Sequence, residues 1–219
     1  GLVSGDWELF ESSSKALTEG NTTLEKDDFI TTLKETSVDK TKKTDEDGRY
    51  MTMSTIQAIN FDDVKDFYVK DLAVPLVPKS NDALVVVSDS EAYFVEFKNG
   101  EIDISKNYQI KIKIYDSLLL LLDLIEKNIS FSRENLHYIL VYNEDIKHTS
   151  SQFDKNEAEK VKKQFSPHRD KIVKRVNNLA AKKYIQFGLE KFERLYFKSV
   201  STYTKKQFEQ LFIKKIETS

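Results

Sequence analysis

The segment from Asp82 to Lys98 constrains the fold more than any other part of the sequence. Residues 83–87 (ALVVV) form a short β-branched run, which is typical of a buried strand. Residues 92–98 (AYFVEFK) have the composition of a second strand, and the turn signal SDSE separates the two runs. Because strands joined by so short a turn pair with each other, the sequence predicts an antiparallel hairpin.

A long helix is predicted after this hairpin, over residues 107–126. Apolar residues alternate with lysines around Ile112, which imitates a strand, but they also recur three and four residues apart as far as Ile125. Two adjoining apolar stripes result, one containing Tyr108 and Leu119 and the other Ile110, so the helix should be largely buried.

The remaining segments complete the expected order of elements. Patterns of apolar and polar residues predict further helices over residues 25–34, 61–69, 154–165, 170–183 and 204–213. Strands are expected over residues 136–142 and within 184–202, and a polar exposed or mobile segment over residues 36–48. In the last helix, the Thr204 hydroxyl should cap the N-terminus, and the inward residues should be Phe208, Leu211 and Phe212.

This order predicts the α/β (α+β) class, with a mixed β-sheet flanked by helices. The chain has 219 residues, of which 39% are hydrophobic, and this suits a single domain over residues 1–219. We expect residues 1–50 to form a polar, partly flexible N-terminal segment and residues 60–145 to form the core. Residues 147–219 are basic, with 18 Lys/Arg against 8 Asp/Glu (net +10), although the whole chain has a net charge of −2.

Composition excludes several classes of chemistry. The chain contains no cysteine, which excludes disulfides, thiolate metal sites and cysteine nucleophiles. No signal peptide is visible at the N-terminus, and the most apolar run, residues 118–122, is far shorter than the ~20 residues that span a bilayer. We therefore expect a soluble, cytoplasmic protein with no membrane partner. His148 and His168 are expected at the surface.

The hairpin carries polar residues where a catalytic site could form. Glu96 and Lys98 are two residues apart on one strand, so their side chains share a face, and Phe97 points to the opposite face. Asp82 stands at the start of the other strand. Mg²⁺ takes carboxylate ligands, so Asp82 and Glu96 could bind it together with the main-chain carbonyl of Phe97. Lys98 could then position a water or stabilise negative charge during phosphodiester hydrolysis.

The motif of Asp82, thirteen intervening residues and then Glu96-Phe97-Lys98 resembles the PD-(D/E)XK nuclease superfamily, in particular its prokaryotic or phage-borne members. The resemblance covers residues 60–145 and implies a restriction-endonuclease-like core. It implies that Asp82 and Glu96 bind Mg²⁺, for which Mn²⁺ would substitute, and that Lys98 is the catalytic lysine.

Two further features bear on this resemblance. Gln109 matches a glutamine that touches the site in some branches of the superfamily, although a surface position would explain it equally. Asn81 stands where the proline before the aspartate is common, and this difference removes no metal ligand. Some branches also use an upstream acid, and the sequence leaves four candidates open: Glu25, Asp62, Asp63 and Asp66.

The predicted function is a metal-dependent nuclease that acts on DNA in preference to RNA. Basic residues of the C-terminal third would contact phosphates, namely Lys162, Lys163, Arg169, Lys171, Lys174 and Arg175. They could equally form a solvated helical face, and Glu96 and Lys98 could form an exposed salt bridge at the edge of the hairpin. Two alternatives therefore stay open: a non-catalytic nucleic-acid-binding protein, and an assembly protein that forms a homodimer.

Overall fold

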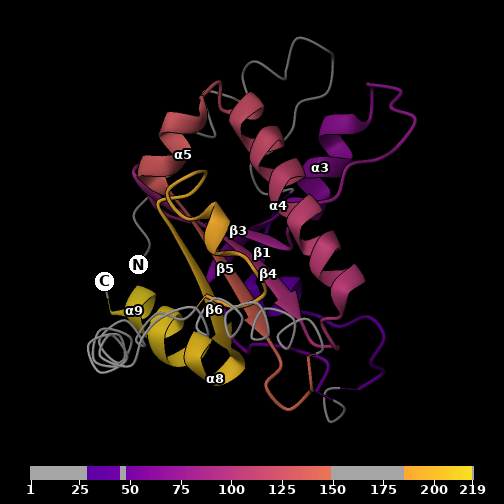
Figure 1. Cartoon of the computed structure of the whole chain (residues 1–219), viewed down its shortest axis with the longest axis vertical. Helices are drawn as coiled ribbons and strands as arrows, with labels where there is room; N and C mark the ends of the chain where they lie inside the picture. The colour runs from indigo at the N-terminus through magenta and orange to yellow at the C-terminus, as the bar shows by residue number, and fades with distance from the viewer. Residues whose placement is uncertain (1–28, 45–47, 149–184, 219) are drawn as a thin grey trace, which may run out of the picture.

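The computed structural model of the chain describes residues 29–44, 48–148 and 185–218. One six-stranded β-sheet runs through this part, and its strands lie side by side in their sequence order (Figure 1). The strands are β1 (Ile30–Thr32), β2 (Gln57–Asn60), β3 (Ala83–Ser88), β4 (Glu91–Lys98), β5 (Leu136–Tyr142) and β6 (Ser199–Thr204). Neighbours from β1 to β4 are antiparallel, whereas β4, β5 and β6 are parallel, so the sheet is mixed.

Helices flank this sheet on both faces (Figure 1). The helical segments are α2 (Leu33–Thr36), α3 (Phe61–Val69), α4 (Ile104–Leu124), α5 (Ile129–Asn135), the 3-10 turn η3 (Glu190–Phe192), α8 (Lys205–Phe208), the π-helical η4 (Glu209–Ile213) and α9 (Lys214–Glu217). The predicted class, a mixed sheet flanked by helices, is confirmed. No helix among the described residues is long and apolar enough to cross a bilayer.

The predicted hairpin is formed by β3 and β4, which are antiparallel with Leu84 opposite Phe94. The strands extend further than expected, so that only residues 89–90 connect them. Successive residues point to opposite faces of a strand. Phe94 therefore joins the core beneath α4, and Phe97 packs on the other face, where its ring lies 5.6 Å from that of Phe208.

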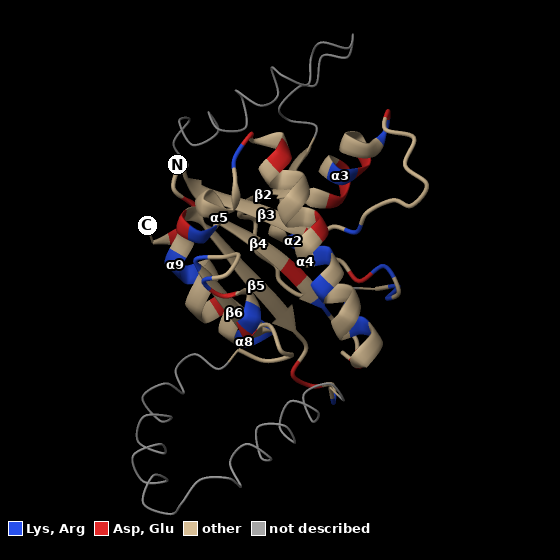
Figure 2. Cartoon of the chain, turned by 45° about the horizontal axis from the view of Figure 1, so that its top comes forward, with Lys and Arg blue, Asp and Glu red and all other residues tan. Residues whose placement is uncertain are grey.

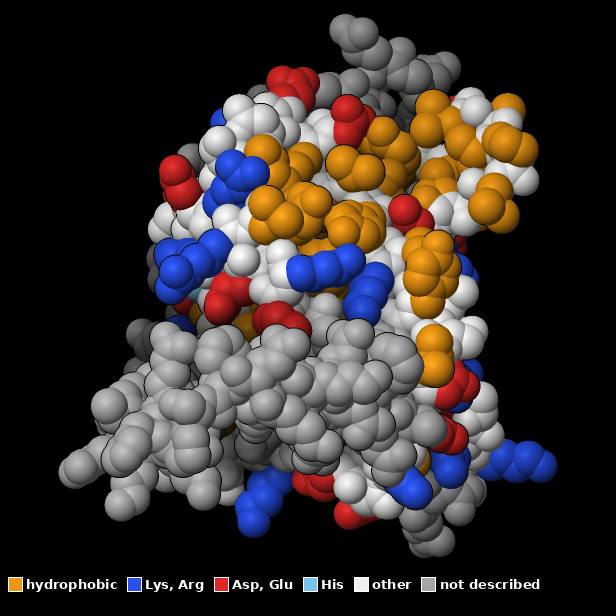
Figure 3. Space-filling view, in the orientation of Figure 1, with side chains coloured by type: hydrophobic (Ala, Val, Ile, Leu, Met, Phe, Trp, Pro, Cys, Tyr) orange, Lys and Arg blue, Asp and Glu red, His pale blue; other side chains and the backbone are white. Residues whose placement is uncertain are grey.

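Helix α4 confirms the long helix predicted after the hairpin, although it begins earlier, at Ile104. The stripe that contains Ile110 and Ile114 is fully buried against the sheet. The second stripe is not, because Tyr108 and Leu119 are 64% and 67% exposed. Orange side chains accordingly gather over α4 and α3 in Figure 3. Only one face of the helix can touch the sheet, so the prediction of a largely buried helix is wrong for this outer stripe.

Near the start of the described chain, the predicted helix over residues 25–34 is wrong where the structure can test it. Residues 30–32 form strand β1, and α2 begins only at Leu33. Pairing with β2 places Ile30 opposite Ile59, so β-branched residues add an edge strand instead of a helical turn. Residues 25–28 lie outside the described part of the chain.

The C-terminal helical segment begins as predicted. The Thr204 hydroxyl accepts a hydrogen bond from the backbone N–H of Gln207 (3.1 Å) and caps α8. Phe208 and Phe212 are buried as expected, but Leu211 is 54% exposed, so its predicted inward position is wrong. The π-helical turns of η4 are wider than α-helical turns and shift which residues face the sheet.

Other elements match their predictions. Helix α3 has the predicted bounds, β5 is the strand over residues 136–142, and β6 begins within residues 184–202. The helices predicted over residues 154–165 and 170–183 lie outside the described residues.

Candidate functional site

Asp82 lies directly before β3, where it reaches across to the neighbouring strand. Its Oδ2 atom accepts a hydrogen bond from the backbone N–H of Phe97 (2.7 Å). Its own carbonyl accepts one from the backbone N–H of Phe61 (3.3 Å), which ties it to the start of α3. The carboxylate of Asp82 is thus held beside the stretch of β4 that carries Glu96 and Lys98.

Glu96 is a charged residue in the middle of the sheet, and its side chain is completely buried. In Figure 2 the strands are mostly uncharged, and charged residues concentrate on helices and connections. Because Lys98 shares its strand face, the Lys98 Nζ atom lies 2.5 Å from Oε1 of Glu96. The shared face was predicted from the two-residue spacing and is confirmed. Burial excludes the alternative of an exposed surface salt bridge.

A third element adds Lys113, which was not among the predicted site residues. From α4, its Nζ atom lies 2.9 Å from Oδ1 of Asp82. The same atom lies 2.8 Å from Oε1 and 3.0 Å from Oε2 of Glu96. One ammonium group therefore bridges both carboxylates. The sequence could have indicated Lys113 as a site residue, because it follows the candidate Gln109 by four residues and so shares its helix face.

Burial and neighbouring charges act in opposite directions on the pKa values of this cluster. Burial raises the pKa of Glu96, and the charge of Asp82 raises it further, whereas Lys113 and Lys98 lower it. Burial by itself would lower the pKa of Lys113, but the charges of Glu96 and Asp82 outweigh burial and raise that pKa. Lys113 is therefore an ammonium ion at neutral pH. The carboxyl groups of Asp82 and Glu96 thus lie against two lysine side chains, and buried groups of this kind require such partners.

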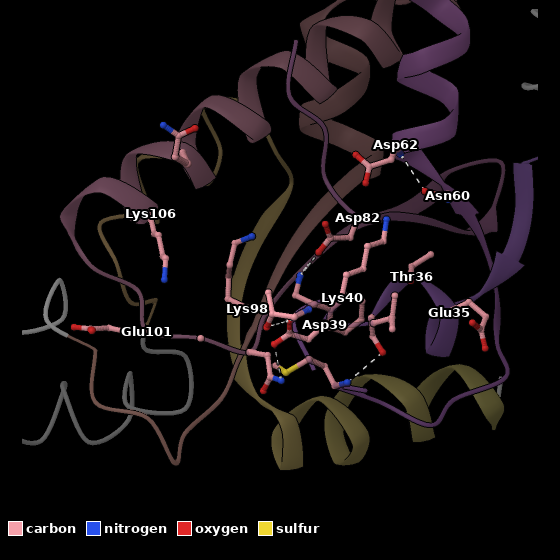
Figure 4. Close-up of a pocket in the computed structure, with 18 residues that line it drawn as sticks. Glu35, Thr36, Asp39, Lys40, Asn60, Asp62, Asp82, Lys98, Glu101 and Lys106 are labelled. Atoms are coloured by element: carbon pink, nitrogen blue, oxygen red, sulfur yellow. Dashed lines mark hydrogen bonds between the residues drawn. The ribbon is translucent and has the colours of Figure 1, made fainter. Parts of the chain in front are cut away.

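A pocket of about 550 Å³ opens beside this cluster (Figure 4). Asp82 and Lys98 line it from the hairpin, and Gln109 lines it from α4. Its opposite wall comes from residues 35–41, which belong to α2 and the loop after it. Glu96 and Lys113 are not among the lining residues, so the bridged carboxylate lies behind the pocket wall.

This wall corrects the expected character of residues 36–48. Within the described part of that range, Ser37 is buried, and its hydroxyl donates to the carbonyl of Lys34 (2.8 Å). Asp39 is also fixed, because its Oδ2 accepts a hydrogen bond from Nδ2 of Asn99 (3.1 Å). The segment is a loop, as predicted, but it forms part of a cavity instead of being wholly exposed.

Of the candidate upstream acids that lie in the described part of the chain, only Asp62 lines this pocket together with Asp82. It stands in the first turn of α3 and accepts a hydrogen bond from the Ser80 hydroxyl. Asp63 and Asp66 lie in the same helix but do not line the pocket. Glu25 lies outside the described residues.

The carboxylates of Asp82 and Glu96 lie close enough together to bind one Mg²⁺ ion. Asp82 and Glu96 both reach one cationic atom within 3.0 Å, so a single smaller cation could draw the two carboxylates to ~2.1 Å. No group of three or more His, Asp or Glu side chains suited to a metal occurs among the described residues. One or two carboxylates with waters are a usual set for Mg²⁺. A metal-binding role for the Phe97 carbonyl stays a prediction.

Two further predictions concern residues away from the cluster. His148 was expected at the surface, and this is wrong: it is 8% exposed and accepts a hydrogen bond at Nδ1 from the backbone N–H of Ile102 (3.0 Å). It ties the end of the hairpin to the chain after β5. His168 and the six basic residues predicted to contact phosphates all lie outside the described part of the chain.

The hydroxyl of Tyr138 is influenced by the charges of Glu96 and Asp82 but forms no hydrogen bond with either residue. The side chain is fully buried, and its hydroxyl has no hydrogen-bond partner among the described residues. Burial raises the pKa of Tyr138, and the charges of Glu96 and Asp82 raise it further, so the hydroxyl stays protonated. An unpaired buried hydroxyl costs stability.

We therefore expect Tyr138→Phe to raise the free energy of unfolding by about 1 kcal/mol, measured by urea denaturation. The matched control is Tyr142→Phe on the same strand, because the Tyr142 hydroxyl accepts a hydrogen bond from Nε2 of Gln186 (2.6 Å). That variant should lower the same free energy by about 1 kcal/mol. A loss of stability in Tyr138→Phe would show that its hydroxyl is bonded after all.

Comparison of the chain with protein-family models, with curated proteins and with solved structures gave no match.

Proposed function

We propose that this chain is a metal-dependent nuclease that hydrolyses phosphodiester bonds, with DNA preferred to RNA. One observation carries the proposal: Asp82, directly before β3, and Glu96, in β4, converge on a single cationic atom while Lys98 contacts Glu96. Carboxylates that meet in this way are the ligands Mg²⁺ requires. A buried Glu beside two lysines has no evident value for stability alone, because desolvating charges is costly.

The order of elements supports the restriction-endonuclease-like core that is part of this proposal. Strands β2, β3 and β4 form an antiparallel series, α4 follows, and β5 returns parallel to β4. Asp82 and the Glu96-Phe97-Lys98 motif then lie at one end of the β3–β4 pair, beside the pocket.

Each residue has a defined part in the proposed reaction. Asp82 and Glu96 would hold Mg²⁺, and Mg²⁺ in such a site polarises the phosphate and lowers the pKa of bound water. Lys98 keeps a quarter of its side chain exposed and has three N–H donors, so it can hold Glu96 and also donate to a water or phosphate oxygen in the pocket. Hydrolysis forms a bond from water oxygen to phosphorus and breaks the bond from phosphorus to the leaving oxygen, which takes up a proton.

The test is cleavage of end-labelled single- and double-stranded DNA and RNA by the purified full chain. We expect cleavage of DNA with Mg²⁺ or Mn²⁺ and none with EDTA, because both carboxylates would then lack their metal. Asp82→Asn should be inactive with either metal, and this separates the chain's own activity from a contaminating nuclease. Absence of cleavage for every substrate, with either metal, would refute the proposed function.

The position of Lys113 favours a second candidate function, that of a non-catalytic nucleic-acid-binding protein. An ammonium group between the two carboxylates could replace a metal permanently, which would leave a non-catalytic nucleic-acid-binding protein. Such a protein would bind DNA in a salt-dependent manner through its basic residues. Binding measured by fluorescence anisotropy would then be insensitive to EDTA and accompanied by no cleavage.

A further inference from the structure

The strongest unexplained feature is the place that Lys113 takes between Asp82 and Glu96. Its Nζ atom is within 3.0 Å of three carboxylate oxygens, and its side chain is 19% exposed. A metal bound by the same oxygens would require the same space. Two cations cannot share it, because like charges at such a distance repel strongly.

Resting on the proposed function, we propose that Lys113 is a resident counter-ion that holds the two carboxylates together and that must leave before Mg²⁺ binds. In the metal-free protein, its charge offsets the cost of burying Glu96. The carboxylates are thereby kept in the positions that a metal needs. The same contacts lower the affinity for the metal, since Mg²⁺ binding must first break them.

The structure also offers the displaced ammonium group an acceptor. Gln109 lies one helical turn before Lys113 on α4, and residues four apart are neighbours on a helix surface. The Oε1 atom of Gln109 is buried and has no hydrogen-bond partner among the described residues. Gln109 lines the pocket, whereas Lys113 does not. A move of Nζ toward Gln109 would therefore carry a positive charge toward the pocket, where a phosphate would meet it.

Metal affinity without nucleic acid tests this directly. We expect Lys113→Met, which keeps the length of the side chain, to lower the Kd for Mn²⁺ in calorimetry by about tenfold or more, since a competing charge pair is gone. Lys106→Met is the matched control, because Lys106 lines the same pocket but has no ion pair with either carboxylate. It should change the Kd by less than about threefold, as an exposed charge acts weakly. An equal effect of both variants, or weaker binding by Lys113→Met, would overturn the proposal.

The proposed move of Lys113 toward Gln109 can be tested separately from its displacement. Gln109→Leu removes the acceptor and should raise the Kd for Mn²⁺ about threefold, the loss expected for one ordinary hydrogen bond. An unchanged Kd would refute the move toward Gln109 while leaving the displacement itself in place.

A crystal structure of the unaltered protein with Mn²⁺ decides the matter even if Lys113→Met does not fold. We expect an anomalous peak between Asp82 and Glu96, with the Nζ atom of Lys113 beyond hydrogen-bond distance of both. Nζ still bridging the carboxylates at saturating Mn²⁺ would overturn the proposal. Metal bound there without any DNA cleavage would instead refute only the nuclease activity.

Discussion

Replacing Lys98 by alanine should abolish most of the DNA cleavage, with a fall in kcat of about 10²–10³-fold in Mg²⁺. The reason is geometric, because Lys98 is an ammonium group that contacts Glu96 and also lines the pocket where a phosphate would lie. Without it, the attacking water and the developing negative charge lose the ammonium donor that lies next to Glu96. Single-turnover cleavage of labelled DNA measures the change.

The control for this variant is Lys127→Ala, which removes an exposed lysine remote from the motif, just after α4. It should cleave DNA at the rate of the unaltered protein. Circular dichroism and thermal unfolding should show Lys98→Ala folded, since Lys113 still neutralises Glu96. A folded Lys98→Ala protein with full activity would rule out a catalytic role for this lysine.

The second large effect concerns stability. Phe94→Ala should lower the free energy of unfolding by about 3–5 kcal/mol, because it removes a fully buried ring and leaves a cavity. The Phe94 ring lies 4.9 Å from that of Phe61 and 6.5 Å from that of Phe197. It thus joins β4 to the start of α3 and to the chain before β6. Urea denaturation measures the loss.

Leu119→Ala gives the matching control, because Leu119 lies on the outer face of α4 and is 67% exposed. Its free energy of unfolding should change by no more than about 0.5 kcal/mol. A large loss there would mean that the outer stripe of α4 is covered in solution. A small loss for Phe94→Ala would mean that the core beneath α4 is less tightly packed than the structure indicates.

Local patterns predicted the parts of the fold that depend on neighbours in sequence. The hairpin, α3, α4 and β5 follow from runs of β-branched residues or from helical spacing, and each was found. Strand β1 was missed, because Ile30–Thr32 is a strand only through its pairing with β2. The exposure of Leu211 was missed because a π-helical turn, which no local pattern indicated, shifts the helix face.

For the candidate site, too, the sequence predicted only the features that depend on residues close together in the chain. Strand alternation alone placed Glu96 and Lys98 on one face, because successive side chains point to opposite sides of a strand. The sequence could not show that Glu96 is completely buried, since burial depends on how α4 lies over the sheet. Nor could it show Lys113, which reaches the two carboxylates from a different element.

The sequence by itself thus determined the hairpin, the long helix after it and the shared face of Glu96 and Lys98. Each of these depends on backbone periodicity within a short stretch of chain. Only the tertiary structure decided that Asp82 meets that face, that residues 35–41 wall the pocket and that Lys113 bridges the carboxylates. These contacts join residues from separate elements, so they depend on how the core packs those elements together. The Lys113 bridge also pairs charges that burial would otherwise leave without a partner.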